Sequence, residues 1–410
     1  MTTTTITQKR PSLSPAVVLW IGIIGVFLII GLVSAFLVLR DGLILTNLSD
    51  SVPWGLWITL DLSAIALGAG AFTLSAIVYI FNVKRFRPIV RLAILVGLIG
   101  YTTALLTLVM DIGRPDRFWH PWVYWNVHSV LWEITWCITI YLTIMLIEFA
   151  PVIADHSFFD RWPNVRVVAG KLHKLAPFLA VAGLLISLLH QSSLGATYGI
   201  LKARPIWFKP SMPIMFIVSA IAVGPAITMA LAWIVEWVSE GRKKLPHDIL
   251  YSIARFSGIA LLVYAYIKFW DLAAVAYYGR TPGSETAFEI LNTFTPYGFG
   301  FWVVEIILGI VIPVILFLHP RFRKNPGALV VGALLAALGL VFSRWNVTVS
   351  GLIVPLTYAL GTLFQVPPAD YSPSLVEWGV AVGVLGYVML LFTVAVYFLP
   401  IFEYKDETGH

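Results

Sequence analysis

A short, charged stretch lies between two long apolar segments, and its residue types could exchange protons beside a polar ring. Residues 111–120 read DIGRPDRFWH, with two Asp, two Arg and one His. The aromatic stretch that follows ends on His128, Trp132 and Glu133. Carboxylates and imidazoles within hydrogen-bond reach of a reacting oxygen can give or take its protons. Aromatic side chains can wall a pocket for a flat ring, or form an ordinary membrane-interface belt.

Four carboxyls, Glu133 among them, lie deeper, inside apolar segments. They are on the same side of the membrane as DIGRPDRFWH. Asp61, Glu133, Asp271 and Glu305 lie roughly 9–14 Å below the helix ends at 1.5 Å per residue. Ionisable residues inside membrane helices are costly to bury and often mark functional sites. Buried ion pairs are the alternative, and Lys268 is a candidate counter-ion for Asp271 at i, i+3. As a group, the carboxyls predict a site or a proton entry route.

The composition says what kind of elements must position these residues. The chain has 410 residues, 59% hydrophobic and 12% charged, with a mean hydropathy of +0.88. Soluble domains carry about 25% charged residues, and about 20 apolar residues cross a bilayer as a helix. We therefore predict an all-α integral membrane protein with about ten transmembrane helices. The predicted spans are 16–39, 52–82, 89–110, 127–150, 173–193, 211–238, 250–278, 297–319, 327–343 and 376–400.

The basic residues predict the orientation of the chain. With the N-terminus inside, 18 of the 27 Lys and Arg fall in inner segments, 8 in outer segments and Lys268 within a span. This excess satisfies the positive-inside rule, so both termini are expected in the cytoplasm of a bacterial or archaeal inner membrane. The net charge of +6 therefore does not indicate nucleic-acid binding. The segment 346–366 is apolar but contains Gly351, Pro355 and Gly361, and we predict a re-entrant or surface loop there.

The metal-binding residues are few and badly placed for a redox centre. The single cysteine, Cys137, cannot by itself hold an iron–sulfur cluster or a zinc ion. None of the eight histidines lies near mid-membrane, so no axial pair for a transmembrane haem is predicted. His128 and His190 both lie at the outer boundary, where a metal or haem is the alternative to an ordinary interfacial role. No metal site is predicted.

Six short motifs occur in order along the chain, each of them weak alone. They are PWGLW (53–57), GAGAF (68–72), DIGRP (111–115), HQSSLG (190–195), RWNVT (344–348) and YSPSLVE (371–377). As a set they resemble the NrfD/PsrC family of polysulfide reductase-type membrane subunits, and in particular its ten-span HybB/DsrP-like branch. The resemblance runs from about residue 50 to 400.

The resemblance implies two four-helix bundles flanked by one helix at each end of the chain. The corresponding segments are a tail (1–15), a first helix with its outer loop (16–50), a first bundle (51–210), a second bundle (211–345), an outer loop or re-entrant segment (346–375) and a last helix with its tail (376–410). It also implies a quinone pocket, for menaquinone or ubiquinone, near the outer face of the first bundle. No haem and no iron–sulfur cluster are implied in this chain.

The resemblance also implies which residues form the site and which partners dock there. The pocket candidates are Trp57, Asp61, Asp111, Arg114, His128, Trp132, Glu133, His190 and Gln191. His128 or His190 would bind a quinone carbonyl, and Asp61 or Glu133 would exchange protons, while Arg114 would organise the turn, paired with Asp111. Lys268, Asp271 and Glu305 resemble positions of a proton path. The implied partners are a ferredoxin-like multi-cluster iron–sulfur subunit on the outer face and a hydrogenase, molybdoenzyme or multihaem cytochrome.

We therefore predict the quinone-binding subunit of a respiratory oxidoreductase complex, with no redox centre of its own. Two alternatives stay open at this point: a secondary transporter and a structural membrane anchor for an electron-transfer partner. Transporters usually bind substrate near the midplane between broken helices, whereas the carboxyls here lie off-centre. A structural anchor would use the same carboxyls only as packing pairs.

Overall fold

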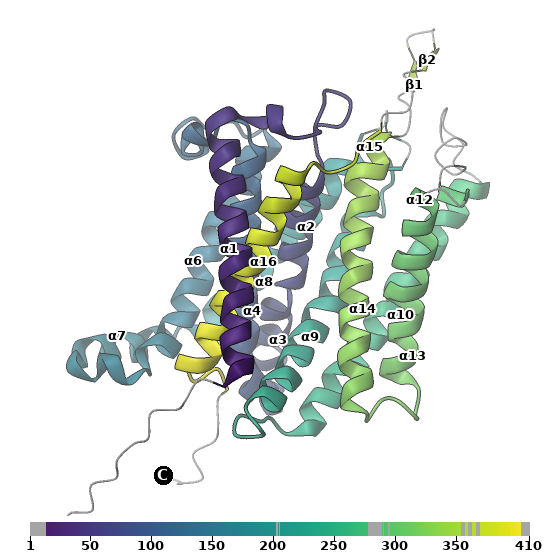
Figure 1. The fold of residues 1–410 in the computed structure, drawn as a ribbon. Helices are drawn as coiled ribbons and strands as arrows, with labels where there is room; N and C mark the ends of the chain where they lie inside the picture. The colour runs from purple at the N-terminus through teal and green to yellow at the C-terminus, as the bar shows by residue number, and fades with distance from the viewer. Residues whose placement is uncertain are drawn as a thin grey trace, which may run out of the picture.

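The computed structural model describes residues 14–201, 204, 206–277, 289, 291–293, 296–353, 357–359, 363–365 and 370–402. Within these residues, 10 helices are long and apolar enough to cross a membrane. They run side by side (Figure 1), which confirms the predicted all-α, ten-span membrane protein. We keep the terms outer and inner for the two ends of the helices, with Asp111 at the outer end. Which end faces the cytoplasm stays a prediction.

The membrane helices follow one another with short connections. In chain order they are α1 (Pro15–Asp41), α2 (Leu56–Leu67) with α3 (Gly70–Tyr79), α4 (Arg87–Asp111), α6 (Val130–Ala154), α8 (Ala176–Gly199), α9 (Met212–Val238), α10 (His247–Tyr277), η5 (Phe299–Val311) with α13 (Ile312–Leu318), α14 (Pro326–Trp345) with η6 (Asn346–Ser350), and α16 (Leu375–Phe398). The connections contain η1 (Leu43–Leu45), η2 (Lys84–Phe86), η3 (Pro115–Arg117), α5 (His120–Val123), η4 (Ser157–Arg161), α7 (Pro163–His173), α12 (Pro296–Gly298), α15 (Gly351–Ile353) and the antiparallel strands β1 (Thr357–Ala359) and β2 (Leu363–Gln365).

The helices form two groups of four. In the first bundle α2 and α3 pack on α4, α4 on α6, α6 on α8, and α8 on α3. In the second bundle α9 packs on α10 and α14, and the η5–α13 helix packs on α10 and α14. The first and last helices, α1 and α16, pack on each other, and α16 also contacts α4 and α2. The predicted bundles are confirmed, and both flanking helices lie against the first one (Figure 1).

The ninth span is longer than predicted. The helix does not end near residue 343, because α14 continues through η6 and α15 to Ile353. The prediction that a loop or re-entrant segment begins at residue 346 is therefore wrong for residues 346–353. All five residues of η6 are buried, and Thr348 bonds to Thr59 of α2 at 2.6 Å, so tertiary packing extends the helix. Residues 354–356, 360–362 and 366–369 lie outside the described residues.

The second span is a helix interrupted at its small residues. It was predicted as one segment, but α2 ends at Leu67 and α3 begins at Gly70. At this point the two bundles touch, because a Cβ atom on Gly224 of α9 would lie 2.3 Å from the backbone nitrogen of Gly70. The GAGAF motif thus permits close helix approach, as small residues do in membrane proteins.

Replacing Gly224 with Ala is expected to lower the free energy of unfolding by about 1–3 kcal/mol, the usual cost of overpacking. The new methyl group would meet backbone atoms of Ala69 and Gly70, which cannot move aside as a flexible side chain can. Denaturant unfolding of the detergent-solubilised chain measures the change. Gly22→Ala is the matched control, since a Cβ there has nothing within 4 Å. Equal stability of the two variants would contradict the close contact.

Candidate functional site

The first bundle contains buried polar side chains whose atoms find no hydrogen-bond partner among the described residues. Asp61 on α2 is 2% exposed, and His190 and Gln191 on α8 are 0% and 1% exposed. The unpartnered atoms are Oδ1 of Asp61, Oδ1 of Asp111, both ring nitrogens of His190 and both amide atoms of Gln191. Buried polar groups normally have a protein or water partner. These atoms are donors and acceptors that can bind water or a polar ligand.

These residues come from three helices and meet in the outer half of the bundle. Asp61 lies close enough to Asp111 and to Tyr101 for a direct electrostatic interaction. The ring of Tyr101 on α4 lies 6.1 Å from the ring of His190, centroid to centroid. Tyr198, further out on α8, is also within electrostatic range of Asp61 and Asp111. From the predicted set, the structure therefore places Asp61 near Asp111, and Tyr101 lies near both Asp61 and His190, which Gln191 follows in the sequence.

Two phenols of this group were missed by the sequence analysis. Tyr101 and Tyr198 are 0% and 4% exposed, and both face the buried carboxyls. The sequence signal for them is a phenol hydroxyl inside an apolar span, which is weaker than that of a carboxyl, an imidazole or an amine. Deeper in the bundle, Ser187 lies close to the phenol oxygens of Tyr101 and Tyr141, without hydrogen-bond geometry to Tyr101. Glu148, near the inner end of α6, has an unpartnered buried Oε1.

The candidates on the outer segment before α6 lie apart from this buried group. His128 is exposed, and Trp132 and Glu133 are half-buried in the first turn of α6. The Trp132 ring lies 5.3 Å from that of Trp125, and its Nε1 has no hydrogen-bond partner in the described structure. Ser129 caps α6 by accepting from the Trp132 backbone nitrogen at 3.4 Å. Local capping therefore places these residues at the outer surface.

Arg114 does not pair with Asp111, so that predicted pairing is wrong. Its Nε and Nη2 donate to the two carboxylate oxygens of Asp116, each at 3.0 Å. The reason is the turn: Gly113 has φ +68°, which directs the chain away from Asp111, a half-buried residue at the end of α4 whose Oδ1 is buried. The hydrogen bonds from Arg114 hold the pKa of the exposed Asp116 carboxyl below its usual range. This pair shapes the surface turn.

Trp57 and Glu377 hold the outer ends of the helices together. Trp57 is 1% exposed and its Nε1 donates to the backbone oxygen of Glu377 at 3.1 Å. The Glu377 carboxylate accepts from the backbone nitrogens of Asn47 at 3.0 Å and Ser374 at 2.9 Å, and from the Tyr371 hydroxyl. The Tyr371 oxygen accepts from the Leu56 backbone nitrogen at 2.9 Å, and burial raises the pKa of this phenol. The YSPSLVE motif is therefore a clamp that joins α16 to α2.

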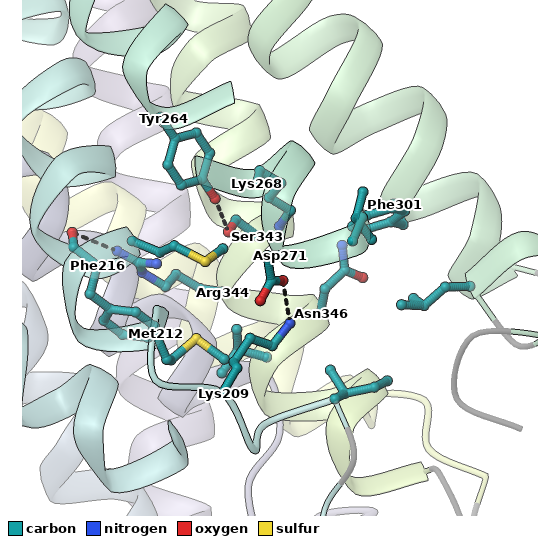
Figure 2. A pocket seen from close by; sticks show the side chains of 15 residues that line it. Lys209, Met212, Phe216, Tyr264, Lys268, Asp271, Phe301, Ser343, Arg344 and Asn346 are labelled. Carbon is teal, nitrogen blue, oxygen red and sulfur yellow. Dashed lines mark hydrogen bonds and ion pairs between the residues drawn. The ribbon is translucent and has the colours of Figure 1, made fainter. Parts of the chain in front are cut away.

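The second bundle carries a separate ionic cluster. Asp271 accepts from Lys209 Nζ at 2.6 Å (Figure 2). It also accepts from Ser211 Oγ at 3.0 Å. Lys268 forms an ion pair with Glu305, whose other oxygen accepts from Asn346 Nδ2 at 2.6 Å. The predicted Lys268–Asp271 ion pair is therefore wrong, because each residue finds its partner on another segment.

The described residues contain two π-helical segments, and the two meet at this cluster. Glu305 lies in the middle of η5, a π-helix of 13 residues, and Asn346 begins the π-helix η6. π-Helical turns are rare and occur frequently at functional sites. Here they bring the Glu305 carboxylate and the Asn346 amide into contact between two helices.

Comparisons with known proteins agree with this architecture. The family model described as "Polysulphide reductase, NrfD" matches residues 44–356. The chain belongs to the NrfD family. This NrfD-family chain is 34% identical to the "Menaquinone reductase, integral membrane subunit" of Nitratidesulfovibrio vulgaris, over 97% of this chain and 95% of the relative. It is 25% identical to the "Hdr-like menaquinol oxidoreductase integral membrane subunit" of Archaeoglobus fulgidus, over 86% of each protein. It is 27% identical to the "Probable Ni/Fe-hydrogenase 2 b-type cytochrome subunit" of Escherichia coli, over 89% of this chain and 87% of the relative.

The last of these names raises the question of haem in this NrfD-family chain. Among the histidine side chains that the structure describes, only His190 is buried within a membrane helix. The others lie at helix ends or in connections, such as His247, which pairs with Glu236 at 3.0 Å. A b-type haem between helices uses a pair of axial ligands on facing helices. The absence of haem stays a prediction.

Proposed function

We propose that this chain is the quinone-binding membrane subunit of a respiratory oxidoreductase complex. The quinone head group binds at the outer end of the first bundle, beside Asp61, Asp111, His190 and Gln191. The observation that carries the proposal is the set of buried, unpartnered polar atoms on these four residues. The relative named menaquinone reductase adds support, since its similarity extends over 97% of this chain.

The chemistry of these side chains fits a quinone. When bound, the quinone supplies a two-electron, two-proton redox couple. His190 and the Gln191 amide offer donors for its two carbonyl oxygens, and Asp61 and Asp111 offer carboxyls that exchange protons with them. The aromatic rings of Tyr101 and Tyr198 supply apolar walls around the polar atoms. Burial supports His190, rather than the exposed His128, as the partner of a carbonyl, and it supports Asp61 over Glu133 for proton exchange.

The chain's polar residues also bear on how protons reach the site. The buried Tyr101, Ser187 and Tyr141 and the half-buried Glu148, whose Oε1 is buried, form a row of polar groups from the site toward the inner end of the first bundle. Unpartnered groups can bind water and pass protons, so we assign proton uptake to this row. Lys268, Asp271 and Glu305 remain candidates for a second proton path. They are bonded in pairs, so a proton could pass only if a pair opened.

The outer segment between α4 and α6 has exposed aromatic residues to which an electron-transfer partner could bind. It exposes Trp119, Tyr124, Trp125 and the neighbouring Val127, with exposed fractions from 41% to 65%. Aromatic residues are enriched in protein interfaces. We propose that a ferredoxin-like multi-cluster iron–sulfur subunit docks here, with His128, Trp132 and Glu133 at its edge. A hydrogenase, molybdoenzyme or multihaem cytochrome would complete the complex in a bacterial or archaeal inner membrane, with both termini cytoplasmic.

Quinone content tests the proposal directly. The complex purified in mild detergent should carry extractable quinone that a quinone-site inhibitor displaces. His190→Leu should lose most of it, because it removes both ring nitrogens from the pocket. His128→Leu and His319→Leu should retain it, since both side chains are exposed outside the buried group.

Three outcomes would contradict the proposal. No quinone in the wild-type complex would favour a structural anchor. Full quinone content in His190→Leu would place the head group elsewhere. Ion flux catalysed by the purified chain in vesicles without an electron donor would favour a transporter.

A further inference from the structure

A cavity in the second bundle contains more positive than negative charge. It is lined by Lys209, Lys268 and Arg344 against a single lining carboxylate, Asp271 (Figure 2). Glu305 lies directly behind Lys268 and is bonded to it. The cavity lies between α9, α10, η5 and α14, and Tyr198 of the first bundle lies within electrostatic range of Arg344 on its wall.

The ion pairs account for two of the three cations. Lys209 pairs with Asp271 at 2.6 Å, and Lys268 pairs with Glu305. Arg344 is 1% exposed and has no carboxylate within 4.0 Å among the residues that the structure describes. Because arginine stays protonated at neutral pH, one positive charge remains uncompensated in the bundle.

The contacts of Arg344 hold it in place without neutralising it. Its Nη2 donates to Ser219 Oγ at 2.9 Å and to the Phe216 backbone oxygen at 3.4 Å. Its guanidinium carbon lies 3.7 Å from the centroid of the Phe216 ring. Its Nε, although buried, has no hydrogen-bond partner in the described part of the chain. Among the described residues, Arg344 therefore has a positive charge without an ion-pair partner and an Nε–H donor without an acceptor.

The volume of the cavity limits the size of the ligand that it can hold. Its volume is about 40 Å³, and roughly 10–15 Å³ of such space holds one water molecule. This is room for one small ion with water, and it is too little for a quinone head group. An unpaired buried charge costs several kcal/mol, so an anion beside Arg344 would stabilise the bundle.

We propose that this cavity binds one small inorganic anion, of the size of chloride, against Arg344. The two lysines increase the positive potential at the site, and the Asn346 amide and Ser343 hydroxyl that line the cavity offer neutral donors. The anion neutralises the cationic excess and holds α14 against α9. This site is independent of the quinone site, because it uses no residue of the first bundle.

Equilibrium dialysis of the purified complex with radioactive chloride, in a gluconate buffer of constant ionic strength, tests the proposal. The wild-type complex should bind one chloride per chain, and Arg344→Gln should lower the affinity at least about tenfold. A second measurement follows thermal unfolding, since a ligand that binds the native state raises its stability. Chloride should raise the unfolding temperature of the wild type and leave that of Arg344→Gln unchanged.

Two control variants keep the test specific. Arg91→Gln removes a half-buried arginine that pairs with Asp155 at 3.0 Å near the inner end, and it should bind chloride as the wild type does. Arg85→Gln removes an exposed arginine whose Nη2 donates to Ser252 Oγ at 3.3 Å, outside the cavity, and it should also retain chloride. If Arg344→Gln fails to assemble, chloride binding by the wild-type complex still tests the proposal. A wild-type complex that binds no chloride overturns it. Equal binding by wild type and Arg344→Gln overturns it too.

Discussion

Replacing Asp61 with Asn is expected to lower quinone turnover by the assembled complex about 10²- to 10⁴-fold, the usual contribution of a general acid or base. Asp61 is 2% exposed and its Oδ1 has no hydrogen-bond partner among the described residues. The amide has nearly the same shape as the carboxyl, but it cannot exchange a proton. The loss should therefore appear in the rate of turnover, while bound quinone and the assembly of the complex are retained.

The measurement is the steady-state rate of electron transfer between the partner proteins and a soluble quinone analogue. Asp248→Asn is the matched control, because this residue is exposed in the first turn of α10 at the inner end. A full rate in Asp61→Asn would remove Asp61 from the proton-exchanging group. An equal loss in Asp248→Asn would show that the assay reports general damage.

Replacing Lys268 with Met is expected to lower the free energy of unfolding by about 3–5 kcal/mol, since it leaves a buried carboxylate without its ion-pair partner. Glu305 is 1% exposed, and Lys268 is its only ion-pair partner in the described structure. The remaining donors, Asn346 Nδ2 at 2.6 Å and the Tyr264 hydroxyl at 3.5 Å, are neutral and cannot replace the lost charge.

The double variant Lys268→Met, Glu305→Gln should recover much of this loss, because neither member of the pair is then left behind as a buried charge without its partner. Tryptophan fluorescence during denaturant unfolding in detergent measures both variants. Arg40→Met tests an exposed pair with Asp41, 2.6 Å apart, and should cost no more than about 1 kcal/mol. If Lys268→Met were as stable as the wild type, the pair would not be the buried contact described here.

The spans were predictable because the bilayer imposes a single rule on them. A backbone in hydrocarbon must satisfy its own hydrogen bonds, so each apolar stretch of about 20 residues becomes a helix. The prediction of a loop failed at the end of the ninth span, because Gly351 indicated a helix end that the structure does not have there. Packing of Asn346 on Glu305 and Thr348 on Thr59 continues the helix past residue 345.

The partners of the buried charges were not predictable from spacing. Lys268 and Asp271 have the right i, i+3 separation, yet each pairs across to another segment, with Glu305 and Lys209. The rotation of each helix about its axis decides such pairings, and rotation depends on contacts with neighbouring helices. The same reason explains Tyr101, whose place beside His190 depends on how α4 faces α8.

The pairing of α1 with α16 has a consequence for how the molecule is made. A Cβ on Gly31 would lie 2.2 Å from Gly383, and Trp20 bonds to Thr393 at 3.0 Å, so the two helices fit each other closely. Synthesis proceeds from the N-terminus, so α1 enters the bilayer before its partner α16 has been made. Until the ribosome has delivered Glu377, the Asn47 amide and the Tyr371 hydroxyl lack their shared acceptor. The outer rim of the first bundle can therefore close only after the start of α16 has been synthesised.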